Sequence, residues 1–212
     1  MHSSVQDSSR LRLLYDLGCA FAGRIDLDEL IPLVMTKVRE VLDAEGASVL
    51  LLDEARQELY FPYVVSERKE VADRLLGLRL PADRGIAGAA LQTGRPIRVD
   101  DVHADPRFYP GIDRATGSTT RSSVAAPLAA RQGTIGVLQV VNRHGGAFDD
   151  DDLAFLEALA GAVAVAAFSN DRPATALGIP GGLNANRFPA GSTVTLPTKG
   201  GPASCARVRI WS

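Results

Sequence analysis

The sequence has few cysteines and no excess of charge of one sign, and both absences exclude classes of protein. Only Cys19 and Cys205 occur in a chain of 212 residues. We therefore expect no disulfide framework, and a reducing cytoplasm is the simplest compartment. The 23 basic and 25 acidic side chains leave a net charge of −2. Because nucleic-acid binding relies on clustered lysine and arginine, we do not expect nucleic acid as the main partner.

Long apolar runs are missing as well. The longest, residues 153–168, contains Glu157, a glycine and many alanines, so it is too short and too weakly hydrophobic for a membrane span. The stretch MHSSVQDSSR at the N-terminus has no apolar core, and we expect no secretory signal and no membrane association. A chain of this length can hold one domain with additional segments.

Apolar spacing predicts the order of the elements. Residues spaced three and four apart predict helices, and alternating β-branched and aromatic residues predict strands. The predicted elements are helices at 11–23 and 27–43, strands at 47–54, 58–65 and near 80, a short helix at 85–94, strands at 96–101, 122–130 and 133–143, and a last helix at about 149–170. Strands grouped together with helices at the ends indicate an α+β fold with a mostly antiparallel sheet.

The composition divides the chain into three parts. Residues 1–9 are polar, and we expect them to be disordered. Residues 10–170 hold the predicted elements and form the expected domain. Residues 171–212 are rich in proline and glycine and have no apolar period, so we predict a low-complexity tail that does not bury enough apolar surface to become ordered.

A long polar segment, ADPRFYPGIDRATGSTTRS at residues 104–122, interrupts the strands. Long loops within a compact domain are uncommon and are usually functional or disordered, so this one is either a linker or a lid over a ligand. Hydroxyl groups such as those of Thr116 and Thr120 suit phosphate and ribose oxygens, and Asp113 could accept hydrogen bonds from a ribose or a base. The same residue types are also ordinary in loops.

Two other features have both a structural and a functional interpretation. In RGIAG, residues 84–88, a helix start offers unpaired amide donors to an anion, and Gly85 and Gly88 allow either close approach of a ligand or close packing of the helix. Gln139 lies in an apolar row of its strand, where a buried amide must find partners. Those partners are either a ligand or backbone and water.

The acidic run in NRHGGAFDDDD, residues 142–152, is more simply explained by helix capping than by a metal. Asp149 is placed to be the N-cap of the last helix and Asp152 to occupy its first turn, where negative charge is favourable. Phe148 and Leu153 have the spacing of a hydrophobic staple. Arg143 could pair with Asp152, and we predict no metal site.

Together these pieces resemble the GAF domain family of small-molecule sensors over about residues 10–170. The similarity is greatest to the cyclic-nucleotide-binding GAF domains of phosphodiesterases and bacterial adenylate cyclases. It rests on motifs that occur in the family's order, namely GIAG, TG.PI...D...DPRF, D..TG..TR, IGV...VN[KR] and F...D. The resemblance implies a PAS- or profilin-like fold in which helices pack on one face of the sheet. On the other face, a lid made by the loop and a short helix within it covers a ligand pocket.

The resemblance also assigns roles to residues. It implies that Ile86 and Ala87 offer backbone donors near the nucleotide phosphate. It implies that the lid contacts the nucleotide through Tyr109, Asp113, Thr116 and Thr120, and that the sheet contacts it through Gln139 and Ser48. It implies that a structural motif is formed by Asn142, Arg143, Phe148 and Asp152. Two departures stand out: Leu153 replaces a glutamate of that motif, and no acidic residue matches the base-reading position near Val64 and Val65, so the choice between cAMP and cGMP stays open.

Several functions follow from the resemblance. We expect a regulatory sensor module, not an enzyme, that binds cAMP, cGMP or another small molecule without a cofactor, forms a homodimer and signals through its terminal helices to an effector domain or partner. The alternative is a GAF-like dimerisation module with another ligand or none. A methionine sulfoxide reductase would need clustered cysteines near the pocket. A haem or bilin sensor would need a ligating His or Cys there, for which His103 and His144 are poor candidates.

Overall fold

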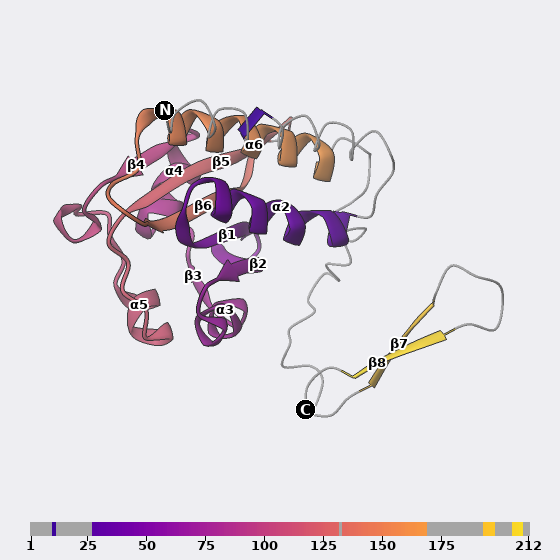
Figure 1. The fold of residues 1–212 in the computed structure, drawn as a ribbon. Coiled ribbons are helices and arrows are strands. Elements are labelled where there is room, and N and C mark those ends of the chain that lie inside the picture. The colour runs from indigo at the N-terminus through magenta and orange to yellow at the C-terminus, as the bar shows by residue number, and fades with distance from the viewer. Residues whose placement is uncertain (1–9, 12–26, 132, 169–192, 198–204, 210–212) are drawn as a thin grey trace. The chain divides into compact units, whose positions relative to one another are not determined.

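Every neighbouring pair of strands in the main sheet is antiparallel. The computed structural model describes residues 10–11, 27–131, 133–168, 193–197 and 205–209. The sheet has the order β3-β2-β1-β6-β5-β4 (Figure 1). Its strands are β1 (Ala44–Asp53), β2 (Glu58–Ser66), β3 (Arg79–Pro81), β4 (Ile97–Val99), β5 (Ser123–Ala130) and β6 (Gly133–Arg143). This confirms the predicted α+β fold with an antiparallel sheet.

Two long helices cover one face of this sheet. Helix α2 (Leu27–Val41) packs on β1 and β2, and α6 (Asp150–Phe168) packs on β5 (Figure 1). Val38 of α2 and Leu156 and Leu159 of α6 are fully buried. These are the helices predicted at 27–43 and 149–170, with ends that differ by about two residues. The helix predicted at 11–23 lies outside the described residues, apart from Leu11, which is helical.

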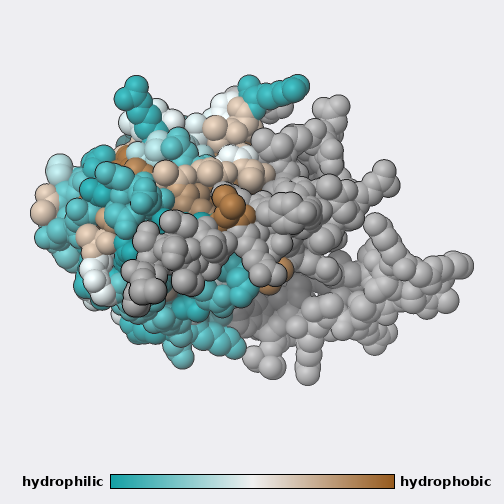
Figure 2. Space-filling model, turned by 45° about the horizontal axis from the view of Figure 1, so that its top comes forward, coloured by the Kyte–Doolittle hydropathy of each residue, from teal (hydrophilic) through white to brown (hydrophobic). Residues whose placement is uncertain are grey.

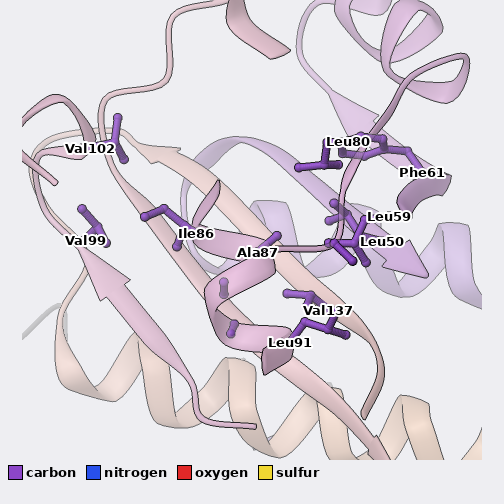
Figure 3. Packing of buried hydrophobic residues seen from close by; sticks show 13 residues of the cluster. Leu50, Leu59, Phe61, Leu80, Ile86, Ala87, Leu91, Val99, Val102 and Val137 are labelled. Carbon is purple, nitrogen blue, oxygen red and sulfur yellow. The ribbon is translucent and has the colours of Figure 1, made fainter. Parts of the chain in front are cut away.

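The opposite face carries four short helical elements. These are α3 (Lys69–Leu76), α4 (Gly85–Thr93), the 3₁₀ helix η1 (Val102–Ala104) and α5 (Gly111–Thr116). Figure 3 shows Ile86, Ala87 and Leu91 of α4 packed toward the sheet, with Leu50 and Val137 of the sheet in the same cluster. Apolar spacing predicts α4 but neither α3 nor α5, although the family resemblance implies a short helix within the lid loop, where α5 lies. Helices of six to eight residues are marginal alone and depend on tertiary contacts that local spacing does not reveal.

A bulge in β2 changes which side chains face α4. Val49 pairs with Tyr63, whereas Leu51 pairs with Tyr60, so two residues of β2 oppose one residue of β1. Pro62 lies at this bulge, a position that tolerates the missing amide donor. Simple alternation would place Phe61 and Val64 on opposite faces, but both pack in the cluster beneath α4.

The chain divides into two compact units, Met1–Arg172 and Pro173–Ser212. In the second unit, β7 (Thr193–Pro197) and β8 (Cys205–Arg209) form an antiparallel pair. The sequence analysis predicts no secondary structure there. The strands are five residues each and contain β-branched Thr193, Val194, Thr195 and Val208, which favour strands, but such short segments do not stand out from a proline- and glycine-rich background.

Among the described residues, no helix combines the length and the apolar character that crossing a membrane would require.

Candidate ligand-binding site

A cavity of about 440 Å³ lies between the sheet and the helices α3, α4 and α5. Its walls include apolar side chains such as Leu50, Phe61, Ile86, Val102 and Tyr109. Polar groups from β1, β6 and the segment after α5 also line it. The volume and the combination of apolar walls with a few polar groups are typical of small-molecule sites. Residues 111–122, which cover the cavity, are called the lid below.

The floor of the cavity is a polar spot in an apolar sheet. Ser48 of β1 lies directly opposite Gln139 of β6, and both side chains line the cavity. The Nε2 of Gln139 donates to the Oγ of Ser123 at 2.9 Å, and Ser123 is fully buried. The sequence analysis considered a ligand, the backbone and water as hydrogen-bond partners of Gln139. In the structure, its partner is the hydroxyl of Ser123. Because an amide has two N–H donors and a carbonyl oxygen, Gln139 keeps further capacity to bind a ligand.

The start of α4 forms one wall. Gly85, Ile86 and Ala87 line the cavity, and Arg84 at the N-cap gives no side-chain cap. The first amides of a helix have no carbonyl partner within it, so this end can donate to an anion. Gly88 is different, because a Cβ there would lie 2.8 Å from the carbonyl oxygen of Ala82. Its role is close packing, which is the structural interpretation of that glycine.

Asp113 and Thr120 both line the cavity, but they bind each other. The carboxylate of Asp113 accepts hydrogen bonds from the amide and the hydroxyl of Thr120, each at 2.7 Å, and from the hydroxyl of Ser118 at 3.2 Å. These bonds close the segment after α5 onto the helix. Asp113 therefore shapes the lid, in addition to any contact that it makes with a ligand.

Thr116 is the one residue of the predicted ligand set that the structure does not bring to the cavity. It is fully buried, and its hydroxyl bonds the carbonyl oxygen of Ile112 at 2.9 Å and the hydroxyl of Ser118 at 2.6 Å. A threonine in a helix commonly bonds the carbonyl four residues earlier. The sequence pattern did not distinguish this arrangement from a ligand contact, because the bounds of α5 within the loop were not predicted.

Asn142 attaches the lid to the sheet. Its carbonyl oxygen accepts from the amide of Arg121 at 2.7 Å, and its Nδ2 donates to Glu45 and to the carbonyl oxygen of Thr119, each at 2.8 Å. Asn142 has a φ of 59°, a left-handed conformation that asparagine tolerates better than most residues. A residue assigned to a structural motif thus also holds the lid and lines the cavity.

Glu45 at the rim was missed by the sequence analysis. It forms an ion pair with Arg121 of the lid and accepts from Asn142. Burial raises the pKa of Glu45, but the hydrogen bonds from Arg121 and Asn142 outweigh it and hold the pKa below its ordinary value. No local signal identifies Glu45, because its partners lie 76 and 97 residues away in the sequence.

The acidic run caps α6, as its spacing predicts. The amide of Asp152 donates to Asp149 at 2.8 Å, and the amide of Asp149 donates back to Asp152 at 3.0 Å. Arg143 and Arg10 both pair with the buried carboxylate of Asp152, and Phe148 is buried beside the cap. Within the described residues, no group of three or more His, Cys, Asp or Glu side chains could hold a metal ion.

The sequence is similar to a known domain family and to part of a known protein. The sequence matches the GAF domain family over residues 26–167. It is 30% identical over 160 residues to a probable 3',5'-cyclic phosphodiesterase, pde-5, of Caenorhabditis elegans, an alignment that covers 72% of this chain but only 22% of that protein. The chain thus spans about a fifth of the length of this relative.

Solved structures agree on the fold. A GAF domain from a phosphoenolpyruvate-protein phosphotransferase of Coxiella burnetii has a TM-score of 0.64 at 19% identity, covering 74% of this chain and 92% of its own. A free methionine-R-sulfoxide reductase of Neisseria meningitidis, solved with its substrate, has a TM-score of 0.62 at 23% identity, covering 74% and 87%.

Proposed function

The chain belongs to the GAF domain family, a family of mainly regulatory domains that bind small ligands, and we propose that its own ligand is a cyclic nucleotide held beneath the lid. The observation that carries the proposal is the cavity itself. The start of α4 offers amide donors, the sheet floor offers Ser48 and Gln139, and apolar walls lie between them. A cyclic nucleotide presents a matching anionic phosphate, a polar base edge and an aromatic ring.

The similarity to a probable 3',5'-cyclic phosphodiesterase supports a nucleotide over other ligands. The apolar part of the cavity, with Phe61, Val64 and Leu80 among its lining residues, suits a flat purine. Val64, and not an acidic residue, lines this part of the cavity, so Gln139 is the polar side chain most suited to bind the base. A glutamine amide can form paired hydrogen bonds with an adenine edge, so cAMP is the first ligand to test.

The proposed role is regulatory and not enzymatic. The methionine sulfoxide reductase of Neisseria meningitidis shows that this fold can also carry an enzyme. No cysteine is among the described residues that line the cavity of this chain, which does not favour the chemistry of a reductase. A sensor would instead pass the bound state to the helices α2 and α6 on the other face of the sheet.

We also propose that the domain pairs with a second copy through its terminal helices. Leu33 of α2 is 55% exposed, one of three large apolar side chains that protrude from the described surface. On the face in Figure 2, hydrophobic residues gather within a mainly hydrophilic surface. A dimer would cover such residues and give the helices a partner through which to signal.

Thermal unfolding with added ligand tests the nucleotide proposal. A ligand at a hundred times its Kd stabilises the native state by about 2.7 kcal/mol, which corresponds to roughly 5–10 °C for a domain of this size. We expect cAMP or cGMP to raise the melting temperature by that amount, and free methionine sulfoxide to leave it unchanged. A shift with methionine sulfoxide and none with either nucleotide would contradict the proposal.

A further inference from the structure

Arg74 of α3, and Arg68 at the N-cap of that helix, hold the end of the lid helix α5. The Nη1 of Arg74 donates to the carbonyl oxygen of Thr116 at 2.8 Å, and the Nη1 of Arg68 donates to the carbonyl oxygen of Gly117 at 3.2 Å. These are carbonyls at the C-terminus of a helix, where the partial charge is negative and a cation is favoured. Gly117 has a φ of 70°, the left-handed turn that ends α5 and exposes these oxygens.

Both arginines donate hydrogen bonds to the lid. Within the described part of the chain, no carboxylate forms an ion pair with either guanidinium, and the lid carbonyls are their hydrogen-bond acceptors. Arg74 also lies close to the lid backbone, since a Cβ on Gly117 would be 3.4 Å from its Nη1. In Figure 1, α3 and α5 lie at the same end of the sheet.

Their helix is a fixed support. Val71 of α3 is buried, Leu75 packs against the cluster beneath α4, and α3 as a whole packs on β2. Hydrogen bonds also connect the two parts of the lid, because the carboxylate of Asp113 in α5 accepts from the hydroxyls of Ser118 and Thr120 after it. The lid is held at several places: to Asn142 and Glu45 near its C-terminal end, where it continues into β5, to α3 at the end of its helix, and to the cluster beneath α4 through Ile112.

We infer that Arg74, assisted by Arg68, is a latch that keeps the lid closed and thereby sets how fast a ligand leaves the cavity. The lid is covalently continuous at both of its ends, with Pro110 and with β5, and the carbonyls at the end of α5 lie between these ends. Arg74 holds one of these carbonyls, so its loss should free the middle of the lid to move away from α3. Arg74 is not among the residues that line the cavity, so it is a positioning residue that acts through the lid and not through contact with the ligand.

Hydrogen–deuterium exchange of the unliganded chain tests the latch without any ligand. We expect Arg74→Ala to accelerate exchange of the lid amides, residues 117–121, while β5 and β6 keep their protection. Arg74→Lys, which keeps one charged donor, should restore part of it. Arg56→Ala is the matched control, because Arg56 is an exposed arginine whose ion pair with Asp53 is remote from the lid. Unchanged lid exchange in Arg74→Ala, or equal acceleration of β5 and β6, would overturn the inference.

The effect on release rests on the proposed function and is measured with cAMP. Losing one hydrogen bond to a charged group should raise the dissociation rate of cAMP by about ten- to a hundredfold, with little change in the association rate. Failure of the wild-type chain to bind cAMP would contradict the proposed ligand but would leave the exchange result to decide on the latch. Binding of cAMP with the same dissociation rate in Arg74→Ala would overturn the latch alone.

Discussion

Single residues that line the cavity also shape the fold around it. Gln139 faces the cavity from an apolar strand, yet it is also oriented by a buried serine. Asp113 and Thr120 line the cavity while binding each other. The sequence identified these positions through their polar character and the family resemblance, but it did not show their partners. Those partners come from a neighbouring strand or from a turn whose conformation local spacing does not determine.

The amide of Gln139 is expected to contribute directly to ligand affinity. Gln139→Leu alone would leave the hydroxyl of Ser123 without its partner, a cost of about 1–3 kcal/mol. Replacing both residues, as Gln139→Leu with Ser123→Ala, removes donor and acceptor together and should nearly preserve the unliganded melting temperature. The same double variant should bind cAMP about tenfold more weakly. Wild-type affinity in a titration of the double variant would show that Gln139 serves the sheet only.

The stability of the folded chain should depend on pH through Glu45, which binds the lid. Because its pKa in the folded chain is lowered, the carboxylate stabilises the fold above its ordinary pKa of 4.5, and this contribution is lost as the pH falls through the lower folded value. Glu45→Gln should therefore melt below the wild type at about pH 6, and the two melting temperatures should converge as the solution is acidified below about pH 4.5. A difference that stays constant or grows on acidification would contradict this assignment.

At the scale of elements, the start of α6 depends on the buried carboxylate of Asp152. It caps the helix with Asp149 and is the shared partner of Arg10 and Arg143. Removing one partner from a buried ion pair costs about 3–5 kcal/mol. Asp152→Ala should lower the free energy of unfolding by about that amount in denaturant titrations.

Asp150→Ala is the matched control for this measurement. Asp150 lies two residues earlier, its side chain is 92% exposed, and it pairs with Arg98 at the surface. Substitutions of this kind usually change stability by about 0.5 kcal/mol or less. Equal effects of the two substitutions would mean that the acidic run acts only through its general charge near the helix start.

The sequence predicts the long elements and several of the short ones. Helix α2 shows a clear apolar face, α6 is a long apolar stretch, and α4 and the strands of the main sheet are also predicted. Apolar spacing does not identify α3 or α5, which span only eight and six residues, and the bulge at Pro62 is a property of strand pairing and not of local spacing. Arg68 and Arg74 therefore had no visible role in the sequence, although they hold the lid in the structure.

At the scale of the whole molecule, the two faces of the sheet carry different parts of the structure. One face holds the cavity and its lid, and the other holds α2 and α6, through which a signal would leave the domain. Asn142, Arg143 and Asp152 connect them, because Asn142 binds the lid and its neighbour Arg143 pairs with Asp152 at the start of α6. The end of β6 thus contacts both the lid and the start of α6.

Self-association is expected at this scale. Analytical ultracentrifugation should show a homodimer at micromolar concentration. Leu33→Lys should shift it toward the monomer with little loss of stability, because Leu33 is exposed in the single chain. A wild-type chain that remains monomeric at high micromolar concentration would contradict both the dimer and signalling through paired helices.

Calorimetric titration of the full chain with cAMP tests the central claim most directly, namely that the cavity beneath the lid binds a cyclic nucleotide. We predict one site per chain and a negative heat-capacity change, because the apolar walls of the cavity and the purine leave water together. We also predict competition by cGMP and weaker binding by the Gln139→Leu, Ser123→Ala double variant. No measurable heat with cAMP or cGMP at millimolar concentration, or binding that the double variant leaves unchanged, would contradict the account.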